Sequence, residues 1–367
     1  MNKALRENSI TFLAAMLVAW LVMYLVPSKI FFTIYVPFSF CWLFWLMILT
    51  VVGRGWPGTP PEGYWKPGMS KAGAGLLMTI LSIVPAALTT LFLINIWPAF
   101  PLFPIGLYFG VLLFTVTLWY ALNWCAYPIA NKSGAVNVVV GAIVILAITV
   151  ILWLTLFNFQ GTPWADAAFN PNGLLDADFM LGLLIWIIVW IMIFGMSLQG
   201  YPFYKLGDPL GKIVLTVVDC ILGYICWTVS LKFMSPSSSW AILGGSIIAM
   251  VLFQATAFAY FPNIKQIQPK RGIYNLIVVA AMVAIWIPLL RFIMTPVLAK
   301  ANAAGVACDI SNMIINLPLN LLCIILMLHS SFWFKMPYAP SGPPIGPEEI
   351  PPEGEVLKEE VVNPARV

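Results

Sequence analysis

Long apolar runs, separated by short polar segments, make up most of this chain. Residues 181–196, LGLLIWIIVWIMIFGM, are typical, because they do not show the alternation of polar and apolar positions that marks a half-buried strand. About 20 apolar residues in an α-helix cross the ~30 Å hydrocarbon core of a bilayer. The pattern therefore predicts ten transmembrane helices, at residues 10–26, 30–52, 74–97, 105–127, 135–157, 179–198, 211–234, 239–262, 273–297 and 308–334.

The composition agrees with this pattern. Hydrophobic residues make up 61% of the 367 residues and charged residues 9%, whereas a soluble domain carries about 25% charged residues. The expected fold is an all-α, polytopic integral membrane protein. The basic start, MNKALREN, precedes an apolar run longer than the ~7–15 residues of a signal peptide, so we interpret residues 10–26 as a retained helix.

The distribution of basic residues predicts the orientation, because short loops rich in Lys and Arg stay in the cytoplasm. With both termini in the cytoplasm, fourteen basic residues fall on that side and only Lys29, Lys232 and Lys300 fall on the other. We therefore expect a multi-pass protein of the cytoplasmic cell membrane with both termini cytoplasmic. The net charge of +4 follows from this bias and does not indicate nucleic-acid binding.

A short motif recurs where predicted helices end on the cytoplasmic side. YPIANKSG (127–134), YPFYKLG (201–207) and, more loosely, YFPNIK (260–265) combine an aromatic residue with proline and lysine, while PGMSKAG (67–73) repeats the P-x-x-x-K-x-G spacing of the first. Proline halts a helix and glycine accepts a turn. Because the motifs follow even-numbered helices, they favour repeated helical hairpins; convergent turn chemistry is the alternative.

These patterns divide the chain into a cytoplasmic N-terminus (1–9), a ten-helix transmembrane domain (10–336) and a C-terminal tail (337–367). The tail is rich in proline and contains six glutamates, so it cannot bury enough apolar surface to fold. We expect a disordered cytoplasmic tail. It either solubilises this end of the chain or docks a protein partner.

Polar residues inside the predicted helices are the candidate functional groups, because they are costly to bury in hydrocarbon. Asp219, Gln254 and His329 all lie toward the cytoplasmic ends of their helices, and we expect them to form an inner polar layer. Asp219 and His329 are the candidates for proton coupling. For His329, a simple hydrogen bond near the interface is the alternative.

An outer polar layer is expected between the ninth and tenth helices. Asn312, Asn316 and Asn320 are spaced four residues apart and therefore share one helix face, near Arg291 of the ninth helix. Pro318 frees a backbone carbonyl on the same helix, as in many carriers. This arrangement predicts a solute or ion pathway. The alternative is that the asparagines only join helices and that Arg291 reaches the membrane surface.

Catalysis is the weaker hypothesis. His329 is the only histidine, so a membrane haem with two histidine ligands is excluded, and no cluster of His, Glu or Cys suggests a di-iron or copper site. The six cysteines include no C-x-x-C pair, and neither HExxH nor G-x-S-x-G occurs. We expect no catalytic residue, cofactor or metal.

The leading hypothesis is therefore a permease for a small solute. An organic anion is the candidate solute because Arg291 carries the charge of the outer layer, and Asp219 is the candidate for coupling transport to protons. The alternative is a non-transporting integral membrane subunit that anchors or organises a protein complex through its acidic tail. Both hypotheses allow an oligomer.

Overall fold

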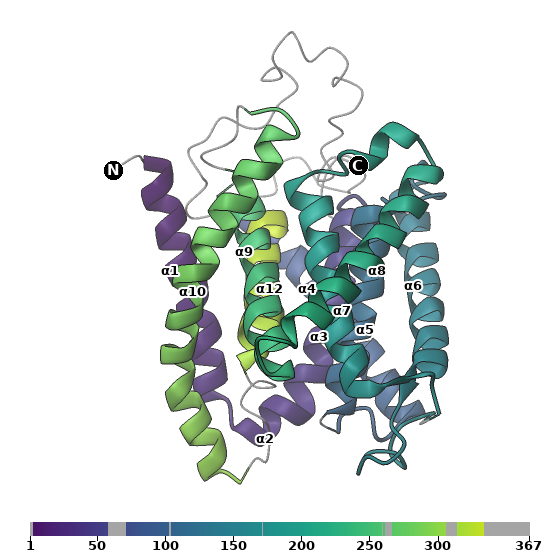
Figure 1. Ribbon diagram of the computed structural model, residues 1–367, viewed down its shortest axis with the longest axis vertical. Coiled ribbons are helices and arrows are strands. Elements are labelled where there is room, and N and C mark those ends of the chain that lie inside the picture. Colours follow the sequence, from purple (N-terminus) through teal and green to yellow (C-terminus); the bar gives the residue numbers. More distant parts are fainter. Residues whose placement is uncertain are drawn as a thin grey trace.

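The computed structural model describes residues 3–57, 71–102, 104–170, 172–258, 260, 266–305 and 314–333. Within these ranges eight helices are long and apolar enough to cross a membrane, and two shorter apolar helices, Ser9–Leu25 and Asn316–Phe332, lie at the first and tenth predicted positions. The chain is a mostly helical, multi-pass, membrane-embedded protein (Figure 1). The predicted tail, the motif segment 67–70 and Asn312 lie outside the described residues.

The odd-numbered and even-numbered spans differ in their helical geometry. The odd-numbered spans are α-helices throughout: α1 (Lys3–Leu25), α4 (Lys71–Ile96), α6 (Gly134–Leu156), α8 (Leu210–Ser230) and α10 (Lys270–Ala303). The even-numbered spans combine α-helix with π-helical segments. They are α2 (Ser28–Ile30), η1 (Phe31–Tyr35), α3 (Val36–Met47) and η2 (Ile48–Val52); α5 (Ile105–Leu118) and η3 (Trp119–Asn123); α7 (Ala177–Met192) and η4 (Ile193–Ser197); η6 (Ser238–Gly244) and α9 (Gly245–Thr256); and η7 (Asn316–Leu322), α12 (Cys323–Met327) and η8 (Leu328–Phe332).

Burial separates the same two sets of helices. Among the eight long spans, the even-numbered helices bury 61–89% of their apolar segments, whereas the odd-numbered helices bury 22–33%. Every residue of α5 is buried. A transmembrane helix that is apolar all round and buried lies inside a bundle, while one with an exposed apolar face meets lipid. The molecule therefore has an inner and an outer layer of helices.

The inner helices form a closed ring among the described residues. In sequence order α3 contacts α5, α5 contacts α7, α7 contacts α9, and α9 contacts η7 and α12. The ring closes because η7 and α12 also contact α3. Glycine permits a close approach at one contact: a β-carbon on Gly110 of α5 would lie 2.3 Å from Cδ2 of Phe40 in α3.

Each outer helix packs against two neighbouring members of the ring or against another outer helix. α4 contacts α3 and η8, α6 contacts α5 and η2, α8 contacts α7 and η3, and α10 contacts α9 and η4. α1 contacts η7 and lies beside α10 at the left of Figure 1. The indole of Trp20 in α1 donates to the Ile293 carbonyl of α10 over 2.7 Å, which joins the first outer helix to the last.

The inner helices share one way of ending. After the last helical turn, the backbone N–H of one residue donates to the carbonyl five residues before it. Two residues further on, a second N–H donates to the carbonyl six residues before that second residue. The first bond of each set joins Gly53 to Ile48, Trp124 to Trp119, Leu198 to Ile193, Phe258 to Phe253 and Trp333 to Leu328. The second joins Gly55 to Leu49, Ala126 to Tyr120, Gly200 to Phe194 and Tyr260 to Gln254. We call these helix-end turns elbows 1 to 5.

Elbows 1, 2 and 3 also share their backbone conformation. Two successive residues have positive φ, after which an aromatic residue precedes a cis proline: Trp56 and Pro57, Tyr127 and Pro128, and Tyr201 and Pro202. The sequence motif was therefore placed correctly at residues 127 and 201. After the second span an elbow of this kind lies at residues 53–57. The motif predicted at Pro67 lies outside the described residues.

The connection between α6 and α7 contains the strands of the described chain. β1 (Phe157–Asn158) and β2 (Leu175–Asp176) pair in parallel. α7 begins directly after β2 because the Asp176 carboxylate accepts a hydrogen bond from the Phe179 N–H over 2.9 Å, which is an N-cap. On the elbow side, the 3₁₀-helix η5 (Phe203–Leu206) leads into α8. These short elements do not change the all-helical class.

Candidate functional site

Buried polar side chains gather where outer helices cross the elbows of neighbouring hairpins. We define junction 1 as the contact of α6 with elbow 1, junction 2 as α8 with elbow 2, and junction 3 as α10 with elbow 3. At junctions 1 and 3 a glycine admits the elbow: a β-carbon on Gly134 would lie 2.6 Å from Trp56 Cβ, and one on Gly272 would lie 2.4 Å from Leu198 Cδ2. At junction 2 the corresponding position of α8 is Thr216, which contacts Trp119 and Trp124 of the inner span and its elbow.

A buried polar residue follows each of these contact positions by three residues. It is Asn137 at junction 1, Asp219 at junction 2 and Asn275 at junction 3, and each side chain is at most 1% exposed. Three residues are nearly one helical turn. The three side chains therefore occupy corresponding places in the fold, although they come from different parts of the sequence.

Junction 2 is closed by a pair of side chains. The Asn123 amide at the end of η3 donates to Oδ2 of Asp219 in α8, and both residues are buried. One turn earlier, the indoles of Trp119 and Trp124 both donate to the Thr216 hydroxyl, over 2.8 and 3.0 Å. Arg291 takes no part. Asp219 is thus held by a neutral amide inside a helix contact.

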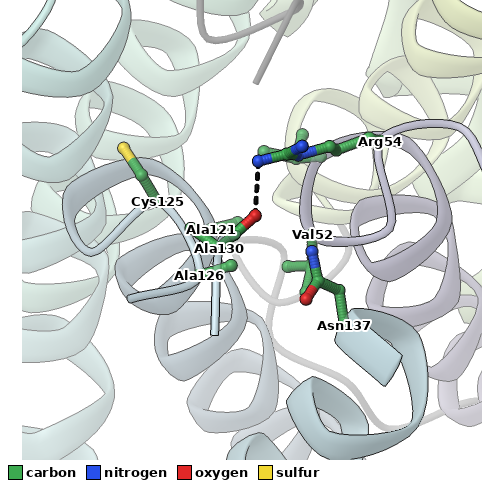
Figure 2. A pocket seen from close by; sticks show the side chains of 8 residues that line it. Val52, Arg54, Ala121, Cys125, Ala126, Ala130 and Asn137 are labelled. Atoms are coloured by element: carbon green, nitrogen blue, oxygen red, sulfur yellow. Dashed lines mark hydrogen bonds between the residues drawn. The ribbon is translucent and has the colours of Figure 1, made fainter. Parts of the chain in front are cut away.

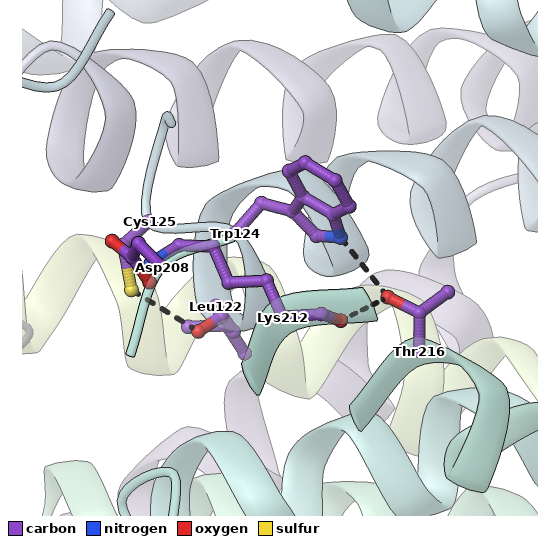
Figure 3. Close-up of polar contacts among 6 residues, drawn as sticks. All are labelled: Leu122, Trp124, Cys125, Asp208, Lys212 and Thr216. Carbon is purple, nitrogen blue, oxygen red and sulfur yellow. Dashed lines mark hydrogen bonds and ion pairs between the residues drawn. The ribbon is translucent and has the colours of Figure 1, made fainter. Parts of the chain in front are cut away.

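Elbow 2 continues this packing beyond the spanning segment (Figure 3). The Cys125 thiol lies 3.4 Å from the Leu122 carbonyl, and Lys212 forms an ion pair with Asp208. Burial raises the pKa of the Cys125 thiol, and the nearby Lys212 opposes part of that effect. Cys125 is therefore a protonated, packed thiol at neutral pH, which does not suit a nucleophile.

Junction 3 is also closed by amide groups. Gln254 of α9 donates to Oδ1 of Asn275 in α10 over 2.9 Å, and both are fully buried. On the elbow side the Arg271 guanidinium donates to Gln199 and lies over the Tyr260 ring, 5.6 Å from its centroid. Burial raises the pKa of the Tyr260 phenol, and Arg271 lowers it by less. The phenol is therefore neutral beside this cation.

Junction 1 differs in the surroundings of its buried residue, Asn137. Its side chain is fully buried, and neither Oδ1 nor Nδ2 has a hydrogen-bond partner among the described residues. It lines a small hollow between η2, elbow 2 and α6 with a cavity volume of about 10 Å³, which is roughly the room of one water molecule. Arg54 lies across the hollow from Asn137 and donates to the Ala130 carbonyl (Figure 2). Small side chains form the other walls: Val51, Val52, Ala121 and Ala126.

The residues expected in an inner layer belong to separate contacts. Asp219 lies at junction 2 and Gln254 at junction 3. His329 is half-buried in η8, next to α4. The structure therefore places the two candidates for proton coupling, Asp219 and His329, on different helix contacts. Asp219 and Gln254 each form a hydrogen bond with the amide of an asparagine.

The residues expected in an outer layer are divided in the same way. Asn316 and Asn320 are buried in η7, and Asn320 donates to the Ser39 hydroxyl of α3, across the closure of the ring. Asn320 and Asn316 also lie within hydrogen-bonding distance, at 3.4 Å. Arg291 is instead exposed on the outer helix α10. Arg291 therefore does not lie with the buried asparagines of η7. Asn312 lies outside the described residues.

Sequence reasoning overlooked Asn123, Asn137, Asn275, Arg54 and Arg271. Each lies close to the predicted end of a span, where a polar residue is normally taken to face water. A signal was present in the chain: when the elbows are aligned by their aromatic–proline pairs, Val52, Asn123 and Ser197 occupy one position. This alignment would have drawn attention to the polar groups around that position.

No three His, Cys, Asp or Glu side chains gather at one place within the described ranges, so we assign no metal centre there. Comparison of the chain with protein-family models, with curated proteins and with solved structures finds no match. The interpretation of function therefore rests on the ring of inner helices and on the three junctions.

Proposed function

We propose that this protein is a transporter for a small solute, with a pathway along the axis of the five inner helices. The proposal is carried by one observation: π-helical segments occur in every even-numbered span and in none of the odd-numbered spans of the described chain. π-Helical turns are rare and often mark functional sites, because they disturb the regular backbone hydrogen bonds. Their restriction to the buried ring indicates that the ring, and not its outer layer, carries the activity.

The inner helices pack directly on one another, so a solute would pass only when they separate. The contact between Ser39 and Asn320 closes the ring and is where such a movement can be blocked. We also infer that the five hairpins arose by repetition of one unit. The shared hydrogen bonds of the elbows support this history, which would explain why the ring closes with equivalent contacts.

A cross-linking experiment in liposomes tests the transport proposal. Ser39→Cys and Asn320→Cys would be combined in a chain whose native cysteines are alanine, and the pair would be oxidised after reconstitution. Uptake of small organic acids, amino acids and neutral solutes would be followed with and without the disulfide. The matched control is Ser230→Cys with Ser239→Cys, because those hydroxyls also touch but join the outer helix α8 to η6.

We expect at least one solute to enter faster than in protein-free liposomes, and the Ser39–Asn320 cross-link to stop this uptake until it is reduced. The control cross-link should leave most of the uptake intact. If no solute enters faster than in protein-free liposomes, the transport proposal is wrong. If both cross-links act alike, the pathway is not in the ring.

A non-transporting membrane subunit is the second candidate. The contact of Asp219 with Asn123 favours it, because a carboxylate closed within a helix junction stabilises a scaffold without serving a solute. In that case purification from the native membrane should yield a stoichiometric protein partner. Removal of residues 337–367 should release this partner if the acidic tail is the contact.

A further inference from the structure

Two oxygen atoms at junction 2 lack a hydrogen-bond donor. The Asn123 amide donates through Nδ2 to Oδ2 of Asp219. The other oxygen of each side chain, Oδ1 of Asn123 and Oδ1 of Asp219, has no hydrogen-bond partner among the described residues and is closed off from solvent. An amide oxygen and a carboxylate oxygen are both acceptors, so these two atoms cannot bond each other unless a proton lies between them.

An ionised Asp219 would also lack a cation. The elements that pack against α8 are α7, η3, η5 and η6. The titratable groups of these elements and of α8 itself are Asp178, Tyr120, Tyr204, Lys205, Lys212, Cys220, Tyr224 and Cys226. The two cations among them have other partners: Lys212 pairs with Asp208, and Lys205 lies over the Tyr201 ring, 5.0 Å from its centroid. Asn123 is therefore the one hydrogen-bond partner of Asp219 in the described part of the chain.

A neutral carboxylic acid suits this place better than a carboxylate. A buried group without a countercharge takes up a proton and becomes neutral, because an unpaired charge is costly to remove from water. The acid form has one O–H donor in addition to its acceptor. An acid and a primary amide can then pair edge to edge, through one N–H and one O–H hydrogen bond. The structure already contains the N–H bond.

We propose that junction 2 binds one proton and that this proton fastens the outer helix α8 to η3. Asp219 is a carboxylic acid whose Oδ1–H donates to Oδ1 of Asn123, while Nδ2 of Asn123 donates to Oδ2. The proton comes from the solvent when the chain folds, and its loss leaves a buried charge with a single donor. The site acts in this way whether or not the inner ring transports a solute.

Infrared spectroscopy tests the protonation state directly, because the carbonyl stretch of a carboxylic acid is separate from the bands of carboxylates and amides. Spectra of the full-length protein at neutral pH would be compared with those of Asp219→Asn. We expect an acid band that is lost in this variant. Asp166→Asn is the matched control, because Asp166 is exposed in the connection between α6 and α7, and it should leave the band unchanged.

The pH dependence of unfolding in detergent provides a second readout. An aspartate of the unfolded chain loses its proton at about pH 4. Above that pH the folded protein holds a proton that the unfolded chain releases, so a rise in pH favours unfolding. The folding equilibrium constant should then fall about tenfold per pH unit relative to Asp219→Asn, until Asp219 itself ionises. Asp219→Asn escapes this loss because its amide donates to Asn123 at every pH.

A third variant tests the partner of the proton. Asn123→Ala keeps the acid and removes the amide that it pairs with, so the acid band should move to higher frequency. Absence of an acid band that depends on Asp219 would overturn the proposal, and so would an equal pH dependence of the natural protein and Asp219→Asn. If neither variant folds, the natural protein with ¹³C-labelled aspartate still decides, because Asp219 is the buried aspartate of the described residues.

Discussion

Junctions 1 and 2 are corresponding places in the fold with opposite solutions to the same problem. In both, an outer helix brings a buried polar side chain against an elbow of the inner ring. At junction 2 the amide of Asn123 meets Asp219 and closes the contact. At junction 1 the elbow offers Val52, and Asn137 faces a hollow beside Arg54. The comparison teaches that one side chain in the elbow decides whether the buried polar group of the outer helix has a hydrogen-bond partner.

The difference has a simple energetic basis. A buried polar group is tolerated when its hydrogen bonds are made and is costly when they are not. Junction 2 meets part of this condition within the protein, through the hydrogen bond from Asn123 to Asp219, so this bond should contribute to stability. Junction 1 does not meet it among the described residues, because neither end of the Asn137 amide has a partner there. Four substitutions test the comparison, in order of decreasing effect.

Asn123→Val should convert junction 2 into a copy of junction 1 and cause the largest loss of stability. It leaves the buried Asp219 side chain without the donor to Oδ2, and we expect a loss of about 2–3 kcal/mol, because a buried polar group without its hydrogen-bond partner is costly. Chemical unfolding in detergent would measure it. The double variant Asn123→Val with Asp219→Leu should recover most of the loss; if it does not, the pair is not the cause.

Thr216→Val should have the next largest effect. It removes the oxygen that accepts from the indoles of both Trp119 and Trp124, and the expected loss is about 1–2 kcal/mol. Thr228→Val is the control on the same helix, because the Thr228 hydroxyl is exposed and bonds only its own helix backbone. Equal losses in the two variants would mean that junction 2 is not specially stabilised.

Val52→Asn should convert junction 1 into a copy of junction 2. The new amide would partner Asn137, so we expect about 1 kcal/mol of added stability. Val52→Leu is the matched control, since it fills space without a polar group. An equal gain in Val52→Leu would mean that filled space, and not a partner for Asn137, stabilises junction 1.

Arg291→Gln should have the smallest effect. Arg291 is exposed on α10 and lies at none of the three junctions, so its replacement should change stability by less than about 0.5 kcal/mol. It should also leave solute uptake unchanged. Loss of uptake in this variant would return Arg291 to the solute pathway that its sequence position first indicated.

The helices themselves were predictable from the sequence. The predicted spans agree with the described helices to within a few residues over most of the chain, as with residues 135–157 and α6 (Gly134–Leu156), because a run of apolar residues long enough to cross a bilayer has few alternatives to a helix. One of the larger differences is α10, which extends from Lys270 to Ala303 and not only over 273–297. Its polar ends are helical although they add little apolar surface.

The junctions were only partly predictable. Asp219, Gln254, Asn316 and Asn320 were recognised because each interrupts an apolar run, and all four are buried. Their partners were not recognised, since Asn123, Asn275 and Ser39 lie near span ends or have small side chains. Periodicity shows that a polar residue must be satisfied, but it does not show which distant residue satisfies it.

The sequence by itself determined the membrane class, the positions of most helices and the recurrence of an aromatic–proline elbow, because these depend on interactions between near neighbours along the chain and on the solvent around it. Only the tertiary structure decided that even-numbered helices form the ring, that Arg291 faces outward, and that Asn137 faces a hollow. These features depend on contacts between residues far apart in sequence, such as Ser39 with Asn320. Which groups meet across such a contact is set by how the helices pack.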